Sequence, residues 1–183
     1  MKKNAAVLLY PGCIFFEIAL AVETLEKSCH VGYFTPDATD HCASNGAVIR
    51  ASGSYSDLAQ LEVDCVLIPG GDPGSIIPDG LANECLKSAH ARGALLAGIC
   101  AGDLVLASTG LLKGVRATHN YTLEYASEEA VAFTQKYWEG IIFERADLVR
   151  DGRIITAQPW AYAAFAAAVA QELGVGAHAA TDY

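Results

Sequence analysis

Short apolar runs alternate with helical segments along most of the chain, and this alternation constrains the fold more than any other feature. The run Ala94–Ile99 contains no polar residue, and helical sequence follows it without a loop, from Ala101 to about Ser108. The run Ala5–Tyr10 is also apolar, Val63–Ile68 is expected to be a further buried strand, and both end at Pro-Gly turns. Strands that are buried on both faces of a parallel sheet give this pattern. We therefore expect an α/β fold, with a doubly wound, mostly parallel sheet and helices on both faces.

The rest of the chain supplies further elements for such a sheet. Helical spacing or helix signals cover Ile14–Lys27, Leu81–Arg92 and Pro159–Leu173, and strands are expected at His30–Thr35 and, shorter and more exposed, at Gly46–Ala51. Asp151-Gly152 between two apolar pairs predicts a β-hairpin. No internal repeat or linker is evident. We expect one domain over residues 1–183, with a core to about residue 174 and a short C-terminal tail.

Composition excludes several classes of partner. The chain has 12 Lys+Arg against 21 Asp+Glu, a formal net charge of -9 and no basic stripe, so we expect no nucleic-acid partner. No stretch reaches the roughly 20 apolar residues that a membrane helix needs, so we expect no membrane partner. The apolar run after Met1-Lys2-Lys3 is interrupted by Pro11-Gly12, which favours a first strand over a secretory signal.

The chain contains six cysteines, at Cys13, Cys29, Cys42, Cys65, Cys85 and Cys100. None are paired as CxxC and none stand near a histidine at zinc spacing, so we expect no metal site. Without an export signal, reduced thiols in a cytoplasmic protein are expected, most of them small core residues. The remaining question is whether one cysteine differs from the others.

Cys100 differs from the others because it stands where a buried strand passes directly into a helix. Gly98 and Gly102 flank it in a G-x-C-x-G pattern, the thiol counterpart of the G-x-S-x-G nucleophile elbow. Such a junction lifts the sulfur above the sheet and places it at a helix N-terminus, where the dipole and free N–H groups favour the thiolate. The alternative is a buried core cysteine beside glycines that allow close helix packing.

Ligands in open α/β sheets bind at the carboxyl ends of the strands. Three turns fall there: Pro11–Glu17, Pro69–Gly74 and Cys100–Gly102. A thiolate that attacks an electrophilic carbon needs donors for the oxygen that becomes negative, and the N–H of Ala101 is one candidate. The Gly70-Gly71 turn can supply the second, and Gly70 and Asp72 are expected to contact the substrate. The alternative is an ordinary turn.

Two further side chains are candidates for proton transfer. Glu17 follows Phe15-Phe16, and a carboxyl among apolar residues resists ionisation. Held near Cys100 and protonated, Glu17 could donate a hydrogen bond to the thiolate; alternatively it is an exposed glutamate at a helix N-terminus. His119 follows an expected short strand and, of the five histidines, has the position that best suits a place near the third turn, which makes it a hypothesis for a base.

Together these motifs resemble the DJ-1/PfpI family over nearly the whole chain, from Met1 to about Gly174. The early acidic residue (Glu17), the Pro69-Gly70-Gly71 turn and the elbow Ile99-Cys100-Ala101-Gly102 match in order. The resemblance implies a flavodoxin-like fold, in a superfamily shared with class I glutamine amidotransferases, and a homodimer. It also implies that Cys100 is the nucleophile, that Glu17 is its protonated partner, and that the amides of Gly71 and Ala101 are oxyanion donors.

Within the family, the segment Leu104–Gly114, then Arg116–His119 and Val149–Gly152, looks most like the isonitrile hydratase branch. That branch typically has Asp at the position of Glu17, Thr at that of Ala101 and Trp at that of Asn120. Glu17 and Ala101 look more like the DJ-1 and glyoxalase side. The protease-like members carry His directly after the cysteine, where this chain has Ala101, so peptidase activity is disfavoured.

Three functions fit these residues. The first is an enzyme, a lyase, hydratase or hydrolase without metal or organic cofactor, in which Cys100 adds to a small electrophile and Glu17 moves the proton. The electrophile would be a 2-oxoaldehyde or an isonitrile. The second is an oxidative-stress sensor or protective protein in which Cys100 is oxidised to a sulfinic acid. The third is a binding module that kept the fold without the chemistry.

Overall fold

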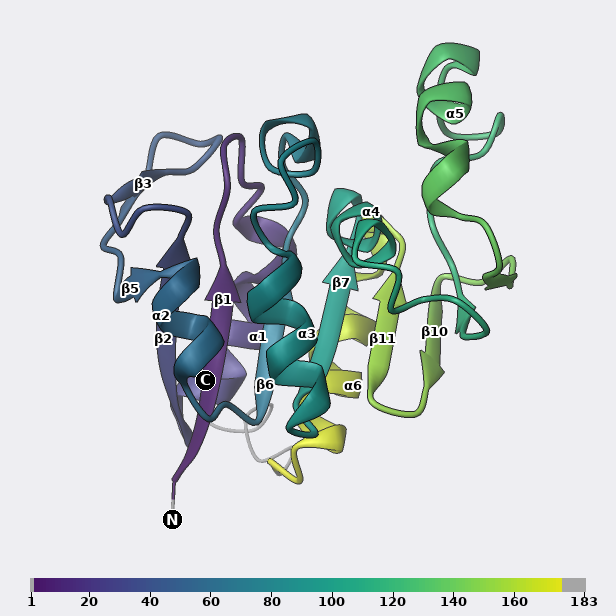
Figure 1. Cartoon of the computed structure of the whole chain (residues 1–183). Helices are drawn as coiled ribbons and strands as arrows, with labels where there is room; N and C mark the ends of the chain where they lie inside the picture. The colour runs from purple at the N-terminus through teal and green to yellow at the C-terminus, as the bar shows by residue number, and fades with distance from the viewer. Residues whose placement is uncertain (1, 176–183) are drawn as a thin grey trace.

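A seven-stranded sheet forms the centre of the computed structural model, which describes residues 2–175 (Figure 1). Its strands are β1 (Lys3–Leu8), β2 (Cys29–Thr35), β5 (Gly53–Ser54), β6 (Cys65–Ile68), β7 (Leu95–Ile99), β10 (Leu148–Asp151) and β11 (Ile154–Ala157). The order across the sheet is β10-β11-β7-β6-β1-β2-β5, and only the β10–β11 pair is antiparallel. The inner strands β2-β1-β6-β7-β11 follow the flavodoxin-like order, so the expected doubly wound fold is confirmed.

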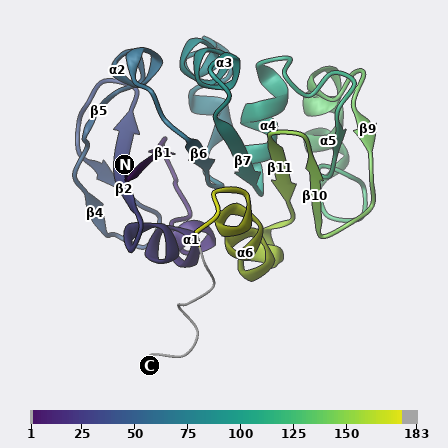
Figure 2. The same cartoon turned by 90° about the horizontal axis from the view of Figure 1, so that it is seen from below.

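Helices cover both faces of the sheet (Figure 2). The helices are α1 (Phe16–Glu26), α2 (Tyr55–Gln60), α3 (Asn83–Ala91), α4 (Ala101–Ser108), α5 (Glu128–Thr134) and α6 (Tyr162–Glu172). The pair α1 and α6 lies on one face, and α2, α3 and α4 lie on the other. Three 3-10 turns are η1 (Pro73–Ser75), η2 (Gln135–Tyr137) and η3 (Pro159–Ala161). No helix in the described part of the chain is long and apolar enough to cross a membrane.

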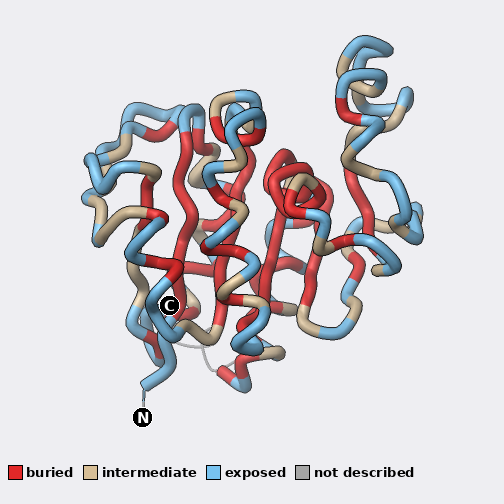
Figure 3. The backbone as a smooth tube through the Cα atoms, viewed as in Figure 1, coloured by how far each residue is buried: buried red, intermediate tan, exposed pale blue. Residues whose placement is uncertain are grey.

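The inner strands β6, β7 and β11 are buried along their whole length (Figure 3). They are covered on both faces because successive side chains enter two different cores. In β6, Leu67 packs under α1 and α6, and its neighbour Val66 packs under the helices of the opposite face. Every residue from Leu95 to Ile99 in β7 is buried, as expected for a central strand. Each leucine fully buried in this way contributes roughly 1.5–3 kcal/mol.

The exposed parts of the chain differ most from expectation. The strand expected at Gly46–Ala51 shortens to β4 (Val48–Ile49), which pairs with β3 (His41–Cys42) in a separate ribbon outside the main sheet. Helix α2 was not expected, although Ser54 and Asp57 form a capping box at its start, with Asp57 N–H donating to Ser54 Oγ over 3.1 Å. Helix α5 was also missed, and Ser127 Oγ caps it by accepting from the Ala130 N–H.

Helix α5 stands beyond the carboxyl ends of the main strands, and a second small sheet lies beside the edge strand β10 (Figure 1). Strand β8 (Arg116–Ala117) pairs in parallel with β9 (Ile142–Phe143), and α5 lies between them in sequence. The short strand expected before His119 is therefore present as β8. The segment from residue 118 to 147 thus lies at the edge of the main sheet where ligands bind in this class of fold. The tail expected after residue 174 lies almost entirely outside the described residues.

Candidate active site

Cys100 forms the junction between β7 and α4, in a backbone conformation that L residues rarely adopt. Its φ and ψ are +60° and -128°. The conformation is fixed on both sides, because Cys100 N–H donates to the Ala157 carbonyl over 2.9 Å and Asp103 N–H donates to the Cys100 carbonyl over 3.1 Å. Strained residues of this kind persist only where the surroundings over-determine them, and they cluster at functional sites. The elbow expected from the G-x-C-x-G pattern is therefore present.

Gly102 allows the elbow to approach the sheet closely. A Cβ at Gly102 would lie 2.0 Å from the carbonyl oxygen of Ile68, a distance that no side chain can occupy. The start of α4 therefore packs directly on the carboxyl end of β6. This contact brings Cys100 next to the Pro69–Gly71 turn that follows β6.

The Pro69–Gly71 turn is held by hydrogen bonds from the segment after β1. Tyr10 Oη donates to the Pro69 carbonyl over 2.6 Å, and Ile14 N–H donates to the Gly70 carbonyl over 2.9 Å. Just beyond the turn, Asp72 N–H donates to the Pro11 carbonyl over 2.7 Å. The three turns expected at the carboxyl edge therefore meet, and two of them are joined by their backbones.

Glu17 lies in the first turn of α1 and is 2% exposed, not an exposed glutamate at a helix N-terminus. Its Oε2 accepts from the Gly70 N–H over 2.8 Å, and its carboxyl group is hydrogen-bonded to Cys100. A Cβ at Gly70 would lie 2.5 Å from Glu17 Oε2 and 3.0 Å from Cys100 Sγ. Carboxyl and sulfur thus lie against the same glycine, where no larger residue fits.

The burial of Glu17 does not come from the aromatic pair before it. Phe16 is 59% exposed, and Phe15 is half-buried and contacts Tyr33 with ring centroids 6.4 Å apart. The Pro69–Gly71 turn and Cys100 lie against the carboxyl instead. Burial raises the pKa of Glu17, against smaller opposing contributions from the hydrogen bonds with Gly70 and Cys100.

The surroundings of Cys100 do not give the lowered thiol pKa that a helix N-terminus alone predicts. Burial raises the pKa of Cys100 well above its ordinary value, and the charge and hydrogen bond of an ionised Glu17 raise it further. The N–H of Ala101, hydrogen-bonded to the sulfur, acts in the opposite direction. The expected thiolate therefore depends on which member of the Glu17–Cys100 pair holds their proton.

The two amides expected as oxyanion donors belong to the elbow and to the Pro69–Gly71 turn. The Ala101 N–H begins α4 and is directed at Cys100 Sγ. The Gly71 N–H has no acceptor among residues 2–175, and a Cβ at Gly71 would lie 2.6 Å from the Tyr10 ring. The neighbouring Gly70 N–H is already occupied by Glu17. Gly71 therefore retains an unused N–H donor in the turn whose preceding residue, Gly70, lies against the sulfur, as an oxyanion site needs.

His119 is buried, and nothing among the described residues hydrogen-bonds it to Cys100. Its ring stacks on Trp138 with centroids 3.9 Å apart, and its Nδ1 accepts from the Tyr121 N–H over 3.1 Å. Burial lowers the pKa of His119 to about 4. The structure thus gives His119 a packing role, and its proposed role as a base gains no hydrogen bond here.

A cavity of about 220 Å³ lies beside the site, between η1, α4 and α5. Asp72 and Tyr121 line it together with Leu104 and Phe133. The exposed Asp72 carboxylate caps η1 by accepting from the Gly74 N–H over 3.1 Å. Burial raises the pKa of Tyr121, and the charge of Cys100 raises it further. Sequence reasoning missed Tyr121, because nothing in its local sequence distinguishes it.

Asp103 is a second buried acid that sequence reasoning missed. It is 0% exposed, and neither carboxyl oxygen accepts a hydrogen bond of good geometry among residues 2–175. Its Oδ1 would lie 2.6 Å from a Cβ at Gly98. Burial raises the pKa of Asp103 well above its ordinary value, against an opposing contribution from the Ala157 N–H. An aspartate three residues after the elbow cysteine, in an otherwise apolar helix, is the signal that could have found it.

The other cysteines divide by exposure. Cys13, Cys29, Cys65 and Cys85 are buried, Cys100 is partly exposed, and Cys42 is exposed. Burial raises the pKa of Cys13 to about 12. Cys13 is 0% exposed, so it is a poor rival to the partly exposed Cys100 for reagents, and Cys42 is the accessible competitor. Residues 2–175 contain no group of three or more His, Cys, Asp or Glu that could hold a metal ion.

Known proteins are similar to this chain in sequence and in fold. Protein dj-1beta of Drosophila melanogaster is 27% identical over 179 residues, which cover 94% of this chain and 90% of that protein. The isonitrile hydratase of Pseudomonas putida is 32% identical over 80 residues, 43% of this chain and 34% of that protein. A two-domain protein of Anabaena variabilis, with DJ-1/ThiJ/PfpI-like and ferritin-like domains, superimposes with a TM-score of 0.81 at 24% identity. This chain is covered completely and spans 52% of that protein.

The family assignment follows from the sequence profile of the DJ-1/PfpI family, which matches residues 3–172. The match contains the three motifs on which the resemblance was based: Glu17, the Pro69–Gly71 turn and the Cys100 elbow. The chain belongs to the DJ-1/PfpI family.

Proposed function

We propose that this chain is a cysteine-dependent enzyme for a small electrophilic substrate, with Cys100 as nucleophile and Glu17 as proton carrier. The observation that carries the proposal is the convergence at Gly70, against which the Glu17 carboxyl and the Cys100 sulfur both lie. A thiolate and a carboxyl in contact supply both the nucleophile and the proton that an addition reaction needs, so the chemistry requires no cofactor.

The reactive form is the thiolate that exists when the shared proton lies on Glu17. Two buried acids in contact cannot both ionise cheaply, so the pair carries one negative charge. A neutral Glu17 no longer repels charge on Cys100, and its O–H becomes a donor to the sulfur. The Ala101 N–H stabilises the same charge. The minor thiolate form can react even where burial favours the thiol.

With a 2-oxoaldehyde, the sulfur adds to the aldehyde carbon and the carbonyl electron pair moves to oxygen, between the Gly71 and Ala101 amides. Glu17 transfers protons during the shift of hydrogen to the neighbouring carbon, and water then releases a 2-hydroxy acid. With an isonitrile, the sulfur adds to the terminal carbon, Glu17 protonates that carbon, and water releases a formamide. Each reaction adds one water molecule overall. The likeness to an isonitrile hydratase supports the second substrate class.

The experiment is a substrate panel on three proteins: the wild type, Cys100→Ser and Cys42→Ser. Methylglyoxal and cyclohexyl isonitrile are each followed to product. We expect turnover of at least one substrate by the wild type and by Cys42→Ser, and a loss of about 10⁴-fold in Cys100→Ser. Cys42→Ser is the matched control because Cys42 is the exposed thiol. Turnover that survives in Cys100→Ser would overturn the proposal.

The role of Glu17 is tested by the rate of alkylation at different pH values. Iodoacetamide should label Cys100 ahead of the four buried cysteines, with Cys42 as an internal reference. Glu17→Gln keeps a donor but cannot pass a proton, so it should preserve alkylation and stop turnover. Glu17→Leu removes the donor and should slow alkylation at low pH. If the alkylation rates of the wild type, Glu17→Gln and Glu17→Leu depended on pH in the same way, Glu17 would not act on the sulfur.

A second candidate is a redox sensor or protective protein, in which peroxide oxidises Cys100 to a sulfinic acid. Cys100 is partly exposed whereas four other cysteines are buried, and a neutral Glu17 could donate to the oxidised sulfur. Intact mass after peroxide distinguishes the functions. Addition of two oxygens at Cys100, in a protein inactive on the whole substrate panel, would favour this second function.

We also propose a homodimer in the cytoplasm. Exposed apolar side chains on α1 and α6, including Phe16, Leu20 and Tyr162, form a surface that a second copy could cover. All six cysteines are unpaired, as is usual where thiols are kept reduced. Light scattering should give about twice the 19.3 kDa of one chain, and a mass near 19.3 kDa would exclude the dimer.

A further inference from the structure

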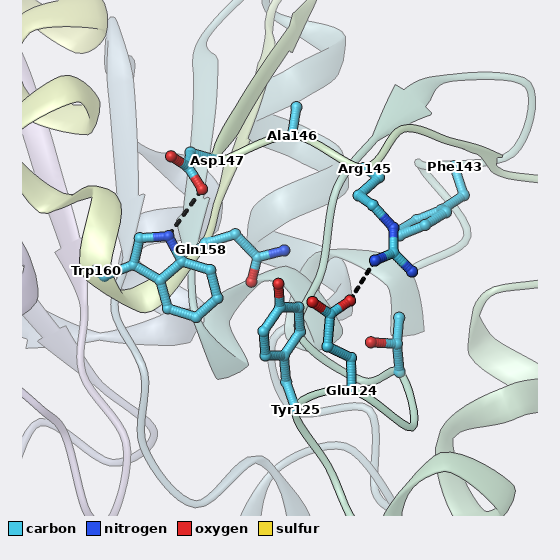
Figure 4. A pocket seen from close by; sticks show the side chains of 9 residues that line it. Glu124, Tyr125, Phe143, Arg145, Ala146, Asp147, Gln158 and Trp160 are labelled. Carbon is cyan, nitrogen blue, oxygen red and sulfur yellow. Dashed lines mark hydrogen bonds and ion pairs between the residues drawn. The ribbon is translucent and has the colours of Figure 1, made fainter.

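A second pocket, of about 70 Å³, lies between residues 122–125, residues 143–147 and the start of η3 (Figure 4). It is separate from the cavity that Asp72 and Tyr121 line, and none of the proposed catalytic residues lines it. The pocket combines three aromatic rings, two carboxylates, one guanidinium and one amide. We propose that it binds a primary alkylammonium group.

The floor of the pocket is the side-chain amide of Gln158, which is only 4% exposed. Its Nε2 donates to the His119 carbonyl and to Thr118 Oγ1, each over 3.0 Å. Because the His119 carbonyl only accepts hydrogen bonds, this contact identifies the nitrogen of the amide. Gln158 Oε1 is therefore the atom left without a partner, and in Figure 4 it points into the pocket.

A second buried atom without a partner belongs to another residue of the lining. Thr122 Oγ1 also lacks a hydrogen bond within the described part of the chain, and Thr122 lines the pocket. A buried acceptor left unpaired costs about 1–3 kcal/mol. The floor thus favours an occupant that donates hydrogen bonds, and an ammonium group has three N–H donors and no acceptor.

The walls of the pocket favour a positive charge. The rings of Tyr125 and Trp160 stand 5.0 Å apart, tilted by 58°, and each can present its negative face to a cation. Trp160 Nε1 donates to Asp147 Oδ1 over 2.8 Å, which fixes the indole and leaves Asp147 Oδ2 available. Arg145 is already paired with Glu124, so the Asp147 carboxylate is the uncompensated charge of the lining. An anion would meet that carboxylate and the ring faces.

The volume sets the size of the group that enters. About 70 Å³ is roughly the space of two water molecules, enough for an ammonium nitrogen and the carbon attached to it. The remaining chain would leave through the mouth of the pocket, past Tyr125 and Trp160. The shared chemistry is an amine on an aliphatic chain, and it comes either from a small free amine or from a lysine side chain in a peptide.

The experiment uses n-butylammonium chloride on the full-length protein, with saturation-transfer NMR and calorimetry as readouts. 1-Pentanol is the neutral ligand of similar shape, and Nα-acetyl-lysine amide tests a peptide source. We expect butylammonium to bind and pentanol to bind at least tenfold more weakly. Binding by acetyl-lysine amide as tight as that by butylammonium assigns a peptide lysine as a possible source, and weaker binding assigns a free amine.

Two variants and a matched control locate the binding. Asp147→Asn keeps the acceptor for Trp160 but removes the uncompensated charge, and Trp160→Leu removes the ring; each should weaken butylammonium binding about three- to thirtyfold. Tyr162→Leu is the control, because it removes an equally exposed aromatic outside the pocket and should leave binding unchanged. Thermal melting verifies that each variant is folded.

Three outcomes would overturn the proposal. Equal binding of butylammonium and pentanol would show an unspecific apolar contact. Binding unaffected by Asp147→Asn and Trp160→Leu would place the amine elsewhere. No binding of any amine would show that water, or a second copy of the chain, satisfies Gln158 and Thr122.

Discussion

The elbow and the segment from residue 118 to 147 both stand at the carboxyl edge of the sheet, but they are held in place differently. The elbow is held by backbone contacts that allow no alternative, such as Gly102 against the Ile68 carbonyl. The outer segment is joined to the rest of the molecule by the backbone pairing of β9 with β8, and it is also held by side-chain contacts, such as the stack of His119 on Trp138 and the ion pair of Arg145 with Glu124. The difference indicates that the sheet fixes the positions of the candidate catalytic residues, while the outer segment shapes their surroundings.

The largest effect is expected from a substitution that displaces the elbow. Gly102→Ala would place a methyl group 2.0 Å from the Ile68 carbonyl oxygen, so α4 must move away from β6. We expect a loss of about 3–5 kcal/mol in the free energy of unfolding, measured by urea denaturation. The comparison variant in the outer segment is Gly140→Ala.

Gly140 has a φ of +82°, and its added Cβ would meet nothing closer than 3.7 Å. The substitution therefore incurs only the backbone strain of a positive φ, about 1 kcal/mol. Equal losses in Gly102→Ala and Gly140→Ala would contradict the proposed contrast between the two regions.

The second prediction compares two tyrosine hydroxyl groups. Tyr10→Phe removes the buried donor to the Pro69 carbonyl and leaves that oxygen unpaired, at about 1–3 kcal/mol. The turn that carries Gly70 and Gly71 then loses one of its supports, so turnover should fall as well. Tyr125→Phe, at an exposed tyrosine of the outer segment, should change stability by less than about 0.5 kcal/mol. Urea denaturation measures the change in stability, and the substrate panel measures the change in turnover. If Tyr10→Phe changed neither, the Pro69–Gly71 turn would not depend on the Tyr10 hydrogen bond.

The same contrast explains which parts could be predicted from the sequence. Buried strands and the elbow were predictable because burial on both faces leaves continuous apolar runs, and a junction without a loop needs glycines such as Gly102. The partnership of Glu17 with Cys100 came from the family resemblance. Its geometry depends on Gly70, which is far from both in sequence, and the burial of Phe15 and Phe16 could not be judged from their order.

The outer segment was poorly predictable because its contacts are formed by side chains from distant positions. Nothing near His119 in the sequence indicates that Trp138 stacks on it, and Tyr121 comes to line the 220 Å³ cavity only through the fold. Helix α5 is short, and its Ser127 cap is a weak signal. Asp103 belongs to the well-predicted elbow, yet its complete burial was not expected, because a charged residue in a first helical turn is usually exposed.

The third prediction concerns the protonation of the buried Asp103 carboxyl near the elbow. Its pKa is raised in the folded protein, so the folded state holds a proton that the unfolded chain loses above about pH 4. This contribution to stability is full below the unfolded pKa and is lost as pH rises toward the folded pKa. Asp103→Asn removes the ionisable group, so the variant should be more stable than the wild type at neutral pH.

We expect a gain of about 1 kcal/mol at neutral pH, because each unit of pKa shift is worth about 1.4 kcal/mol and the unpaired amide offsets part of it. The gain should shrink toward pH 4, as urea denaturation across that range would measure. Asp79→Asn, at an exposed carboxylate, is the control and should show no such trend. A gain that is independent of pH would show that Asp103 is ionised in the fold.

The smallest expected effect concerns His119, the residue of the outer segment that the sequence suggested as a base. A general base must be able to accept a proton at an atom that faces the substrate. Its Nδ1 is already occupied by the Tyr121 N–H, and burial lowers its pKa to about 4, so the ring is neutral and a weak acceptor at neutral pH. His119→Gln should therefore leave kcat/KM within about threefold of the wild type and leave its pH profile unshifted, while the lost stack on Trp138 lowers stability by about 0.5–1.5 kcal/mol. The contrary result would be a loss of tenfold or more in kcat, with a shifted acidic limb of the pH profile and an unchanged melting temperature. It would show that His119 acts in catalysis and that the outer segment takes part in the chemistry.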